Sequence, residues 1–353
     1  MIKRRKTQCV TVQSVAIGSP APVLVQSMTK VPTTDLRRCV HQINKLAQAG
    51  CSLVRLAVPR QADTVALKTI VQRVSIPLIA DVHFSAARAL EAMEAGAAKI
   101  RLNPGNIKDP KDIKRIIACA KAHGVAIRIG VNEASIRDLK QEPVPLDKRI
   151  DVMLRELIRY VRLFEKHRFD QLVLSAKSTD TYRTIEINRR ISDTFDYPLH
   201  LGLTHAGLPE DALVPSAVAL GTLLAEGIGD TIRVSIAGHP VDEAKIACRI
   251  LASLGLCELR EPQLIVCPTC GRTESDVVHL AKRIKKGLKG LTVPVRIAVM
   301  GCVVNGPGEA ADADLAICAA KEKAFLYRQG KRIAVVSNDK LIGAIQAEID
   351  MWQ

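Results

Sequence analysis

Aromatic residues are scarce in this chain, since phenylalanine, tryptophan and tyrosine together make up 3% of its 353 residues. Proteins that bind single-stranded nucleic acid stack bases on exposed aromatic rings, so the scarcity argues against a nucleic-acid partner. No apolar run reaches the roughly 18 residues that a membrane-spanning helix needs, so we expect no membrane insertion. The basic first residues lead into a polar stretch, which argues against a secretory signal and favours a cytoplasmic protein.

Acidic residues are also in the minority, with 36 aspartates and glutamates against 51 lysines and arginines, for a net charge of +15. A field of this sign attracts anions such as nucleic acids, phosphorylated metabolites or an acidic protein partner. The chain contains 10 cysteines and no sign of an extracellular destination. We therefore expect reduced thiols with metal-binding or catalytic roles and no disulfide framework.

The first two-thirds of the sequence alternates short β-branched runs with amphipathic, helix-like stretches. The runs are residues 23–28, 53–58, 78–82, 99–103, 126–131, 171–176, 199–204 and 231–236. Strands that alternate with helices pair in parallel, and eight such units are typical of a closed (β/α)₈ barrel. An open doubly wound sheet is the alternative, but the G-x-G-x-x-G turn of dinucleotide-binding proteins is absent. The sequence predicts an α/β protein with a TIM barrel over residues 1–258 and a small α/β domain over residues 259–353.

Charged and polar side chains gather at the carboxyl ends of the predicted strands, which face the active site in such a barrel. Four arginines and a lysine would repel one another there unless an anion lies among them, and guanidinium groups match phosphate oxygens well. The expected anion-binding residues are Arg55, Arg101, Arg128, Lys177 and Arg233, with His83, Asn103, Asn132 and Ser235 beside them. Lys177 has a second interpretation as a Schiff-base nucleophile.

Three cysteines in the last ninety residues have the pattern of metal ligands. Cys267 and Cys270 have C-x-x-C spacing, and Cys302 lies in a glycine-rich loop. A zinc ribbon needs a second C-x-x-C pair, and a thioredoxin-like motif leaves Cys302 unexplained. Three thiolates with Glu309 as the nearest carboxylate favour an iron–sulfur cluster with one displaceable ligand. Cys318 ends an apolar run, so we expect it to be a buried structural residue.

Eight motifs together resemble one family. They are VQSMT at 25–29, LVRLAVP at 53–59, ADVHF at 80–84, KIRLNPGN at 99–106, IRIGVN at 127–132, EGIGDTIRVS at 226–235, CPTCGRTE at 267–274 and GCVVNGPGE at 301–309. The sequence resembles the 4-hydroxy-3-methylbut-2-enyl diphosphate synthases of the non-mevalonate isoprenoid pathway over nearly its whole length. The two cysteine motifs are the most specific.

The resemblance implies a two-electron reductive ring opening and dehydroxylation of methylerythritol cyclodiphosphate. It implies a 4Fe–4S cluster held by Cys267, Cys270, Cys302 and Glu309, with substrate oxygen displacing the glutamate. It makes Arg55, His83, Arg101, Arg128 and Lys177 diphosphate contacts, and gives Asn132, Ser235 and Asn305 a role in positioning the substrate. It also implies a head-to-tail homodimer and reduction by an acidic carrier, flavodoxin or ferredoxin.

One motif departs from the family pattern. The family reads T-E-A-G where this chain has a histidine, His205, in the glutamate position. A histidine can carry a proton but cannot act as an anionic base, so we hypothesise that His205 substitutes for the glutamate in proton transfer. Two hypotheses from other functional classes remain as alternatives. One is a Schiff-base barrel lyase with a structural zinc domain, and the other is a basic nucleic-acid-binding protein.

Overall fold

The computed structural model describes the chain except for residues 1, 105, 137–143, 205–206, 260, 274, 292, 303–307, 309 and 353. The chain divides into two compact units, Met1–Cys257 and Glu258–Gln353, and each is described by itself. Within the described ranges, no helix has both the length and the apolar character needed to span a membrane.

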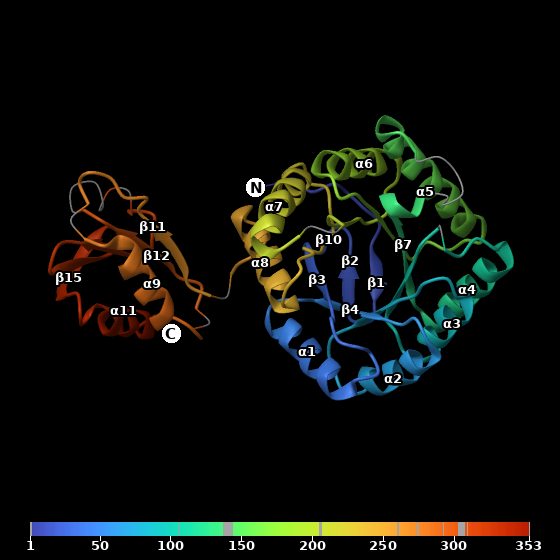
Figure 1. Cartoon of the computed structure of the whole chain (residues 1–353), viewed down its shortest axis with the longest axis horizontal. Coiled ribbons are helices and arrows are strands. Elements are labelled where there is room, and N and C mark those ends of the chain that lie inside the picture. Colours follow the sequence, from blue (N-terminus) through green and yellow to red (C-terminus); the bar gives the residue numbers. More distant parts are fainter. Residues whose placement is uncertain are drawn as a thin grey trace. The chain divides into compact units, whose positions relative to one another are not determined.

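Eight parallel strands form the barrel of the first unit (Figure 1). They are β3 (Leu24–Met28), β4 (Leu53–Ala57), β5 (Leu78–Asp81), β6 (Lys99–Leu102), β7 (Ala126–Asn132), β8 (Leu172–Lys177), β9 (His200–Leu201) and β10 (Thr231–Ile232). Their order is β8-β7-β6-β5-β4-β3-β10-β9. A parallel bridge between Leu174 and Leu199 joins β8 to the start of β9 and nearly closes the ring. The predicted barrel is confirmed, and the open doubly wound sheet is wrong.

Helices surround the strands (Figure 1). They are α1 (Leu36–Gln48), α2 (Gln61–Val71), α3 (Ala86–Glu94), α4 (Pro110–His123), α5 (Arg149–Lys166), α6 (Thr181–Thr194), α7 (Pro209–Ala225) and α8 (Pro240–Ser253), with short 3₁₀ turns η1 (Glu133–Ile136) and η2 (Leu146–Lys148). Helix α4 shows how local sequence sets the ends. The Asp109 side chain caps the first turn, Pro110 suits the first helical position, and Gly124 ends the helix in the left-handed conformation.

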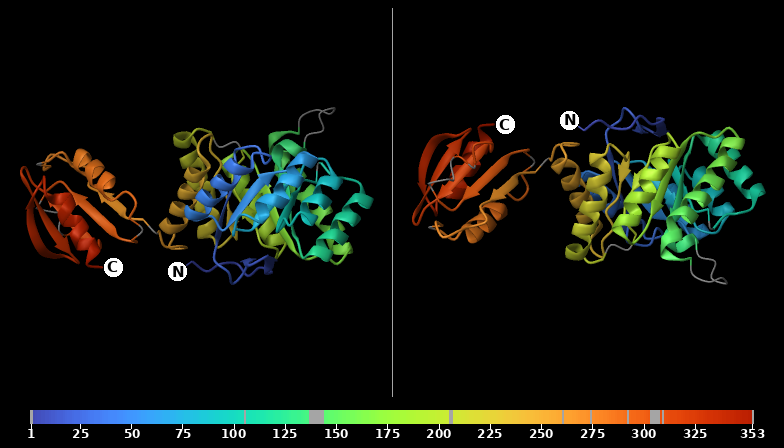
Figure 2. Two further views of the ribbon diagram at one scale, coloured as in Figure 1. Left: turned by 90° about the horizontal axis from the view of Figure 1, so that it is seen from below. Right: turned by 90° about the horizontal axis from the view of Figure 1, so that it is seen from above.

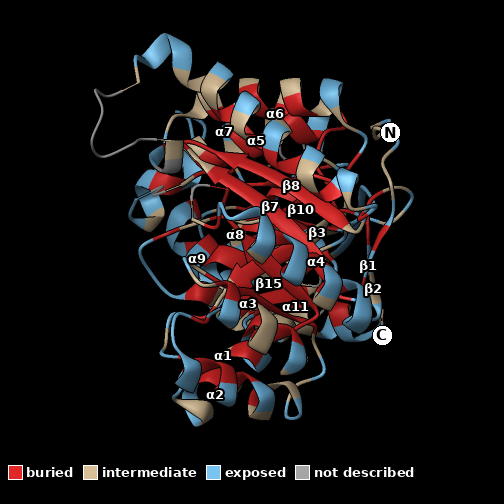
Figure 3. Cartoon of the chain, turned by 90° about the vertical axis from the view of Figure 1, so that its right-hand side faces the viewer, coloured by how far each residue is buried: buried red, intermediate tan, exposed pale blue. Residues whose placement is uncertain are grey.

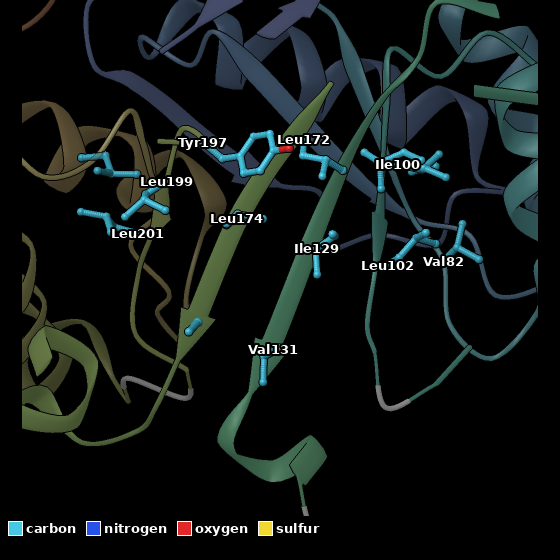
Figure 4. Close-up of a cluster of buried hydrophobic side chains, with 14 of the residues drawn as sticks. Val82, Ile100, Leu102, Ile129, Val131, Leu172, Leu174, Tyr197, Leu199 and Leu201 are labelled. Carbon is cyan, nitrogen blue, oxygen red and sulfur yellow. The ribbon is translucent and has the colours of Figure 1, made fainter. Parts of the chain in front are cut away.

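The main apolar core lies between the strands and the helices. Alternate strand residues point outward to meet the helices, because successive side chains in a strand point to opposite faces. Figure 4 draws part of this layer, which includes Ile100, Leu102, Ile129 and Val131. Figure 3 shows the strands buried along their lengths and the outer faces of the helices exposed. The other half of each strand therefore faces the barrel interior, where the polar residues lie.

A short hairpin that the sequence did not predict closes the amino-terminal end of the barrel. Strands β1 (Val10–Val12) and β2 (Val15–Ile17) pair antiparallel, with Val10 opposite Ile17. Their buried side chains form an apolar cluster with residues at the starts of the barrel strands, namely Leu53, Ile79, Ala98, Ala126 and Val173. Figure 2 shows the hairpin across one end of the barrel. This apolar plug fills the amino-terminal end of the barrel interior, so a polar site is expected at the carboxyl ends of the strands.

The second unit is a five-stranded mixed sheet in the order β11-β12-β13-β14-β15. Its strands are β11 (Gln263–Val266), β12 (Arg296–Met300), β13 (Leu315–Ala319), β14 (Lys323–Arg328) and β15 (Lys331–Ser337), and its helices are α9 (Val277–Gly287) and α11 (Leu341–Asp350). Strands β11, β12 and β13 are parallel, whereas β14 and β15 pair antiparallel. Apolar residues of both helices, such as Ile284 and Ile345, pack on one face of the sheet.

Candidate functional site

A cavity of about 570 Å³ opens at the carboxyl ends of the barrel strands. This volume lies within the range typical of small-molecule sites. Eight of the nine strand-end residues that the sequence pointed to line it: Arg55, His83, Arg101, Arg128, Asn132, Lys177, Arg233 and Ser235. Asn103 is buried at the end of β6, where its carbonyl accepts hydrogen bonds from the amides of Asn106 and Ile107. Its observed contacts therefore shape the turn after β6.

Strand register brings the cationic side chains together. Asp81 on β5 pairs with Arg101 on β6, and Arg101 pairs with Arg128 on β7. Because these positions alternate with the helix-facing residues, all three side chains point inward. Residues far apart in sequence thus become neighbours at one level of the barrel.

Two inward-facing glycines make room for long side chains. A Cβ atom at Gly130 would lie 3.1 Å from Ser175 Oγ and 3.2 Å from Arg101 Nε. A Cβ atom at Gly202 would lie 2.6 Å from Lys177 Nζ. A larger residue at Gly130 would require Ser175 or Arg101 to shift, and one at Gly202 would clash with Lys177 and with the Arg233 carbonyl, which would lie 2.5 Å away. The sequence analysis missed both glycines because their role depends on cross-strand neighbours.

Asp81 is the central carboxylate of the cavity. Its oxygens lie 3.7 Å from Arg55 Nε, 3.6 Å from Arg101 Nη1 and 3.5 Å from His83 Nε2. Burial alone would raise the pKa of Asp81, but the charge of Arg55, the hydrogen bond from His83 and the charge of Arg101 together hold it well below its usual range. Asp81 is therefore ionised, and it holds two guanidinium groups and the imidazole in place.

Glu243 is a second carboxylate in the wall, and the sequence analysis did not identify it. It lies in the first turn of α8, with Oε1 3.0 Å from Lys30 Nζ and Oε2 3.4 Å from Arg233 Nε. Ser27 Oγ donates a hydrogen bond of 2.8 Å to Oε2. Burial alone would raise the pKa of Glu243. The charges of Arg233 and Lys30 and the hydrogen bond from Ser27 have the larger combined effect, so the pKa is lowered overall. An acidic residue in a first helical turn was the available signal, although such residues are common.

Positive charge dominates the described wall. Six lysine and arginine residues line the cavity against two carboxylates, a difference of 6 − 2 = 4 charges if all are ionised. Arg128 is buried and donates a hydrogen bond of 2.9 Å from Nη1 to Ser175 Oγ. Burial and repulsion from Arg128 lower the pKa of Lys177 well below its ordinary value. A wall with this surplus of positive charge attracts a compact anion that carries more than one negative charge.

The three candidate metal-binding cysteines come from one edge of the second unit's sheet. Cys267 follows β11, and its amide donates a hydrogen bond of 2.9 Å to the carbonyl of Val299 on β12. Cys302 follows β12 closely. A Cβ atom at Gly301 would lie 2.9 Å from Thr273 Cγ2, so the Cys302 segment touches the turn that carries Cys270. The carboxyl ends of the parallel strands β11 and β12 thus carry Cys267 and Cys302, and the turn with Cys270 contacts the segment before Cys302.

The individual thiols differ in their surroundings. Cys270 is exposed, and hydrogen bonds from the backbone and side chain of Arg272 lower its pKa, which favours the thiolate. Cys318 is fully buried opposite Met300, and burial followed by the nearby Cys302 raises its pKa to about 11. Its burial agrees with the structural role expected for it.

Some predicted site residues lie outside the described residues, namely His205, Asn305 and Glu309. The described residues nearest to His205 in the sequence, Thr204 and Gly207, both line the cavity. Among the residues that the structure does describe, no group of three or more histidine, cysteine, aspartate or glutamate side chains is close enough to hold a metal ion.

Known proteins resemble the chain along its whole length. The profile of the GcpE TIM-barrel domain matches residues 7–248, and that of the GcpE protein C-terminal domain matches residues 263–351. A protein of Desulfotalea psychrophila (strain LSv54 / DSM 12343) is 42% identical over 99% of this chain and 96% of its own length. One of Dehalococcoides mccartyi (strain CBDB1) is 43% identical over 99% of both chains. Both are named 4-hydroxy-3-methylbut-2-en-1-yl diphosphate synthase (flavodoxin).

Solved structures with a similar barrel have distant sequences. The dihydropteroate synthase of Stenotrophomonas maltophilia aligns with a TM-score of 0.54 at 15% identity, over 70% of this chain and 98% of that one. The enzyme of Xanthomonas albilineans aligns with a TM-score of 0.52 at 16% identity, again over 70% and 98%. At this level of identity the likeness concerns the barrel fold alone.

Proposed function

The chain belongs to the GcpE family, and on that premise we propose that the cationic mouth of its barrel binds the cyclic diphosphate substrate of the family's reaction. The enzyme is an oxidoreductase of isoprenoid precursor biosynthesis. It converts 2-C-methyl-D-erythritol 2,4-cyclodiphosphate into 4-hydroxy-3-methylbut-2-enyl diphosphate. The conversion takes two electrons and two protons, opens the ring at one carbon–oxygen bond, forms a carbon–carbon double bond and releases one hydroxyl group as water.

The surplus of positive charge in the described wall is the observation that carries the assignment of the site. A cyclic diphosphate has one ionised oxygen on each phosphate, so it brings two negative charges. Arg55, Arg101 and Arg128 present guanidinium groups that can bind both phosphates, and Arg233 and Lys177 line the same cavity. Asn132 and Ser235 line the same cavity and offer neutral hydrogen-bonding groups to the sugar-derived carbon chain.

Preorganisation explains how these residues act in the reaction. Asp81 and Glu243 hold four of the cations by ion pairs before any ligand arrives. The cations are therefore fixed by the protein and need little reorganisation when the ring opens and a phosphate oxygen gains charge. His83 lies beside Asp81 and forms part of the same rim.

The cysteine set fits a 4Fe–4S cluster by its chemistry. Cys267, Cys270 and Cys302 are soft donors at one sheet edge, and Arg272 favours the thiolate of Cys270. We assign these three residues and Glu309 as the ligands, the last from the family resemblance. When bound, the cluster would supply the two electrons and a Lewis-acidic iron. Asn305, in the same motif as Glu309, is assigned to positioning the substrate.

The electron donor is an acidic carrier protein. The names of the relatives specify flavodoxin, and this chain's net charge of +15 is complementary to an acidic partner. We also propose a head-to-tail homodimer, in which the cluster unit of one subunit serves the barrel of the other. Sedimentation of the cluster-loaded protein tests the dimer, and complementation between a barrel-site variant and a cysteine variant tests the shared site.

His205 is proposed as the proton carrier that takes the place of the family's usual glutamate. The hypothesis predicts that His205→Ala lowers turnover, whereas His205→Glu keeps activity with a shifted pH profile. An unchanged turnover in His205→Ala would contradict this role without affecting the diphosphate site.

A Schiff-base lyase centred on Lys177 is the second candidate. A buried lysine with a lowered pKa suits such chemistry, and Lys177 has this property. The relatives' names and the C-terminal family match favour the reductive enzyme instead. Borohydride treatment with substrate separates the two, because a trapped adduct on Lys177 would support the lyase. Substrate-dependent electron consumption without an adduct supports the reductive enzyme.

A further inference from the structure

Lys99 is a buried cation that does not line the cavity. It begins β6, where it pairs with Ile79 on one side and Ala126 on the other. Its side chain is 0% exposed. The alternation of β6 places it inward, two residues before Arg101 on the same face of the strand. Lys99 therefore lies one level below the wall residues, nearer the apolar plug at the closed end.

No hydrogen-bond partner contacts Lys99 Nζ within the described part of the chain. The titratable groups that act on it are Arg128 from β7, Arg55 from β4 and His200 from β9. The remaining strands contribute apolar or neutral inward residues near this level, with Asp81 on β5 and Lys177 on β8 nearer the mouth. Among the described residues, the charges that act on a protonated Lys99 are thus two guanidinium groups, with no carboxylate beside them.

An anion in the mouth changes this balance. Arg55 and Arg128 belong both to the cavity wall and to the surroundings of Lys99. When phosphate oxygens neutralise these guanidinium groups, the repulsion that they exert on Lys99 falls. The effect increases with the charge of the ligand, because Coulomb energies scale with the product of the charges. Ring opening frees a phosphate oxygen with a second-ionisation pKa near 6, so the linear diphosphate carries more negative charge than the cyclic one.

We propose that Lys99 is largely uncharged in the ligand-free enzyme and is protonated from solvent when the linear diphosphate occupies the mouth. Lys99 would then favour the ring-opened state over the cyclic substrate without touching either. Desolvation by burial, followed by the charges of Arg128 and Arg55, lowers the pKa of Lys99 well below its ordinary value, in agreement with this view. The inference rests on the proposed function, since it requires both diphosphates to bind at the mouth.

Titration calorimetry of the oxidised, cluster-loaded enzyme tests the proposal. Binding of the cyclodiphosphate and of the linear product is measured at pH 8 in buffers of different ionisation enthalpy, which reports proton uptake. The wild type should take up more protons with the linear ligand than with the cyclic one. Lys99→Met should remove that excess and weaken the linear ligand about tenfold, with the cyclic ligand changed less than threefold. Lys114→Met, on the exposed face of α4, is the matched control and should behave like the wild type.

The outcomes separate this inference from the function on which it rests. Equal proton uptake for the two ligands in the wild type, or equal weakening of both in Lys99→Met, would overturn the role of Lys99 alone. If Lys99→Met does not fold, equal proton uptake for the two ligands in the wild type still overturns the role of Lys99. Failure of the cyclodiphosphate to bind at all would instead overturn the proposed site.

Discussion

Asp81 Oδ2 lies 3.7 Å from Arg55 Nε, and the two side chains are only 9% and 11% exposed. Burial lowers the pKa of Arg55 to about 10 despite the opposing effect of Asp81. The other Asp81 oxygen lies 3.6 Å from Arg101 Nη1. One carboxylate therefore links two cations whose own repulsion would otherwise open the site. The pairing keeps the cations in position for a ligand that neutralises them further.

Asp81→Asn should destabilise the ligand-free protein. Removing one partner of a buried ion pair typically costs about 3–5 kcal/mol, because the other charge stays buried and uncompensated. Chemical unfolding checks the loss, and added pyrophosphate should restore part of it by neutralising Arg55 and Arg101. The matched control is Asp112→Asn on α4, whose pairing with Arg115 is largely exposed and should contribute less than ~1 kcal/mol. A variant as stable as wild type without ligand would contradict the central role of Asp81.

Arg128→Lys should raise KM for the cyclodiphosphate about ten- to hundred-fold. Lysine keeps the charge but loses the planar fork, and a hydrogen bond to a charged group is worth ~1.5–3 kcal/mol. Steady-state kinetics with a chemical reductant measures the effect. Arg189→Lys provides the same exchange at a partly exposed arginine that pairs with Glu226, and its KM should not change. An unchanged KM in Arg128→Lys would remove this residue from the phosphate site.

The stability of the ligand-free enzyme should rise between pH 7 and pH 8. The pKa values of Lys99 and Lys177 are lowered in the folded state, so the unfolded chain binds more protons and the free energy of unfolding increases with pH. Each fully affected lysine contributes up to about 1.4 kcal/mol per pH unit. Above pH 8 the increase becomes smaller, because burial raises the pKa of Cys51 to about 12 and its thiol then loses a proton only in the unfolded chain.

Denaturant titrations at the two pH values measure this slope. Lys99→Met should show a smaller increase than the wild type, because one of the two uncharged lysines is gone. Equal slopes for both proteins would show that Lys99 is charged in the folded state.

Cys302→Ser should lose the iron and sulfide that the wild type binds on anaerobic reconstitution. The same result is expected for Cys267→Ser and Cys270→Ser, because one missing thiolate leaves the site incomplete. Cys9→Ser changes an exposed cysteine of the other unit and should bind iron normally. Full iron content in Cys302→Ser would exclude this residue as a ligand.

The barrel could be predicted because its signals are local. Each predicted run contains or overlaps a strand, since β-branched runs and capped helices report their own conformation. The strand-end cations could be predicted as well, because the carboxyl ends of barrel strands meet at one mouth. The hairpin of β1 and β2 could not, since three-residue strands carry little pattern and are stabilised by contacts with Ile79 and Val173 far away in sequence.

Residues whose role depends on neighbours across the barrel were also missed. Glu243 looks like an ordinary first-turn acid until α8 places it beside Arg233 and Lys30. Gly130 and Gly202 matter because Ser175 and Arg101 lie against the first, and the Arg233 carbonyl and Lys177 lie against the second. Lys99 begins a strand, where the sequence alone does not separate a solvated lysine from a fully buried one.

Phosphorus NMR of the turnover reaction tests the central claim most directly. The enzyme is reconstituted anaerobically with iron and sulfide, supplied with reduced flavodoxin, and incubated with methylerythritol cyclodiphosphate. We expect the resonances of the cyclic diphosphate to be replaced by those of a linear diphosphate ester, with two electrons consumed per molecule converted, and no replacement in Cys302→Ser. Persistence of the cyclic resonances with fully cluster-loaded, reduced enzyme would contradict the proposed reaction.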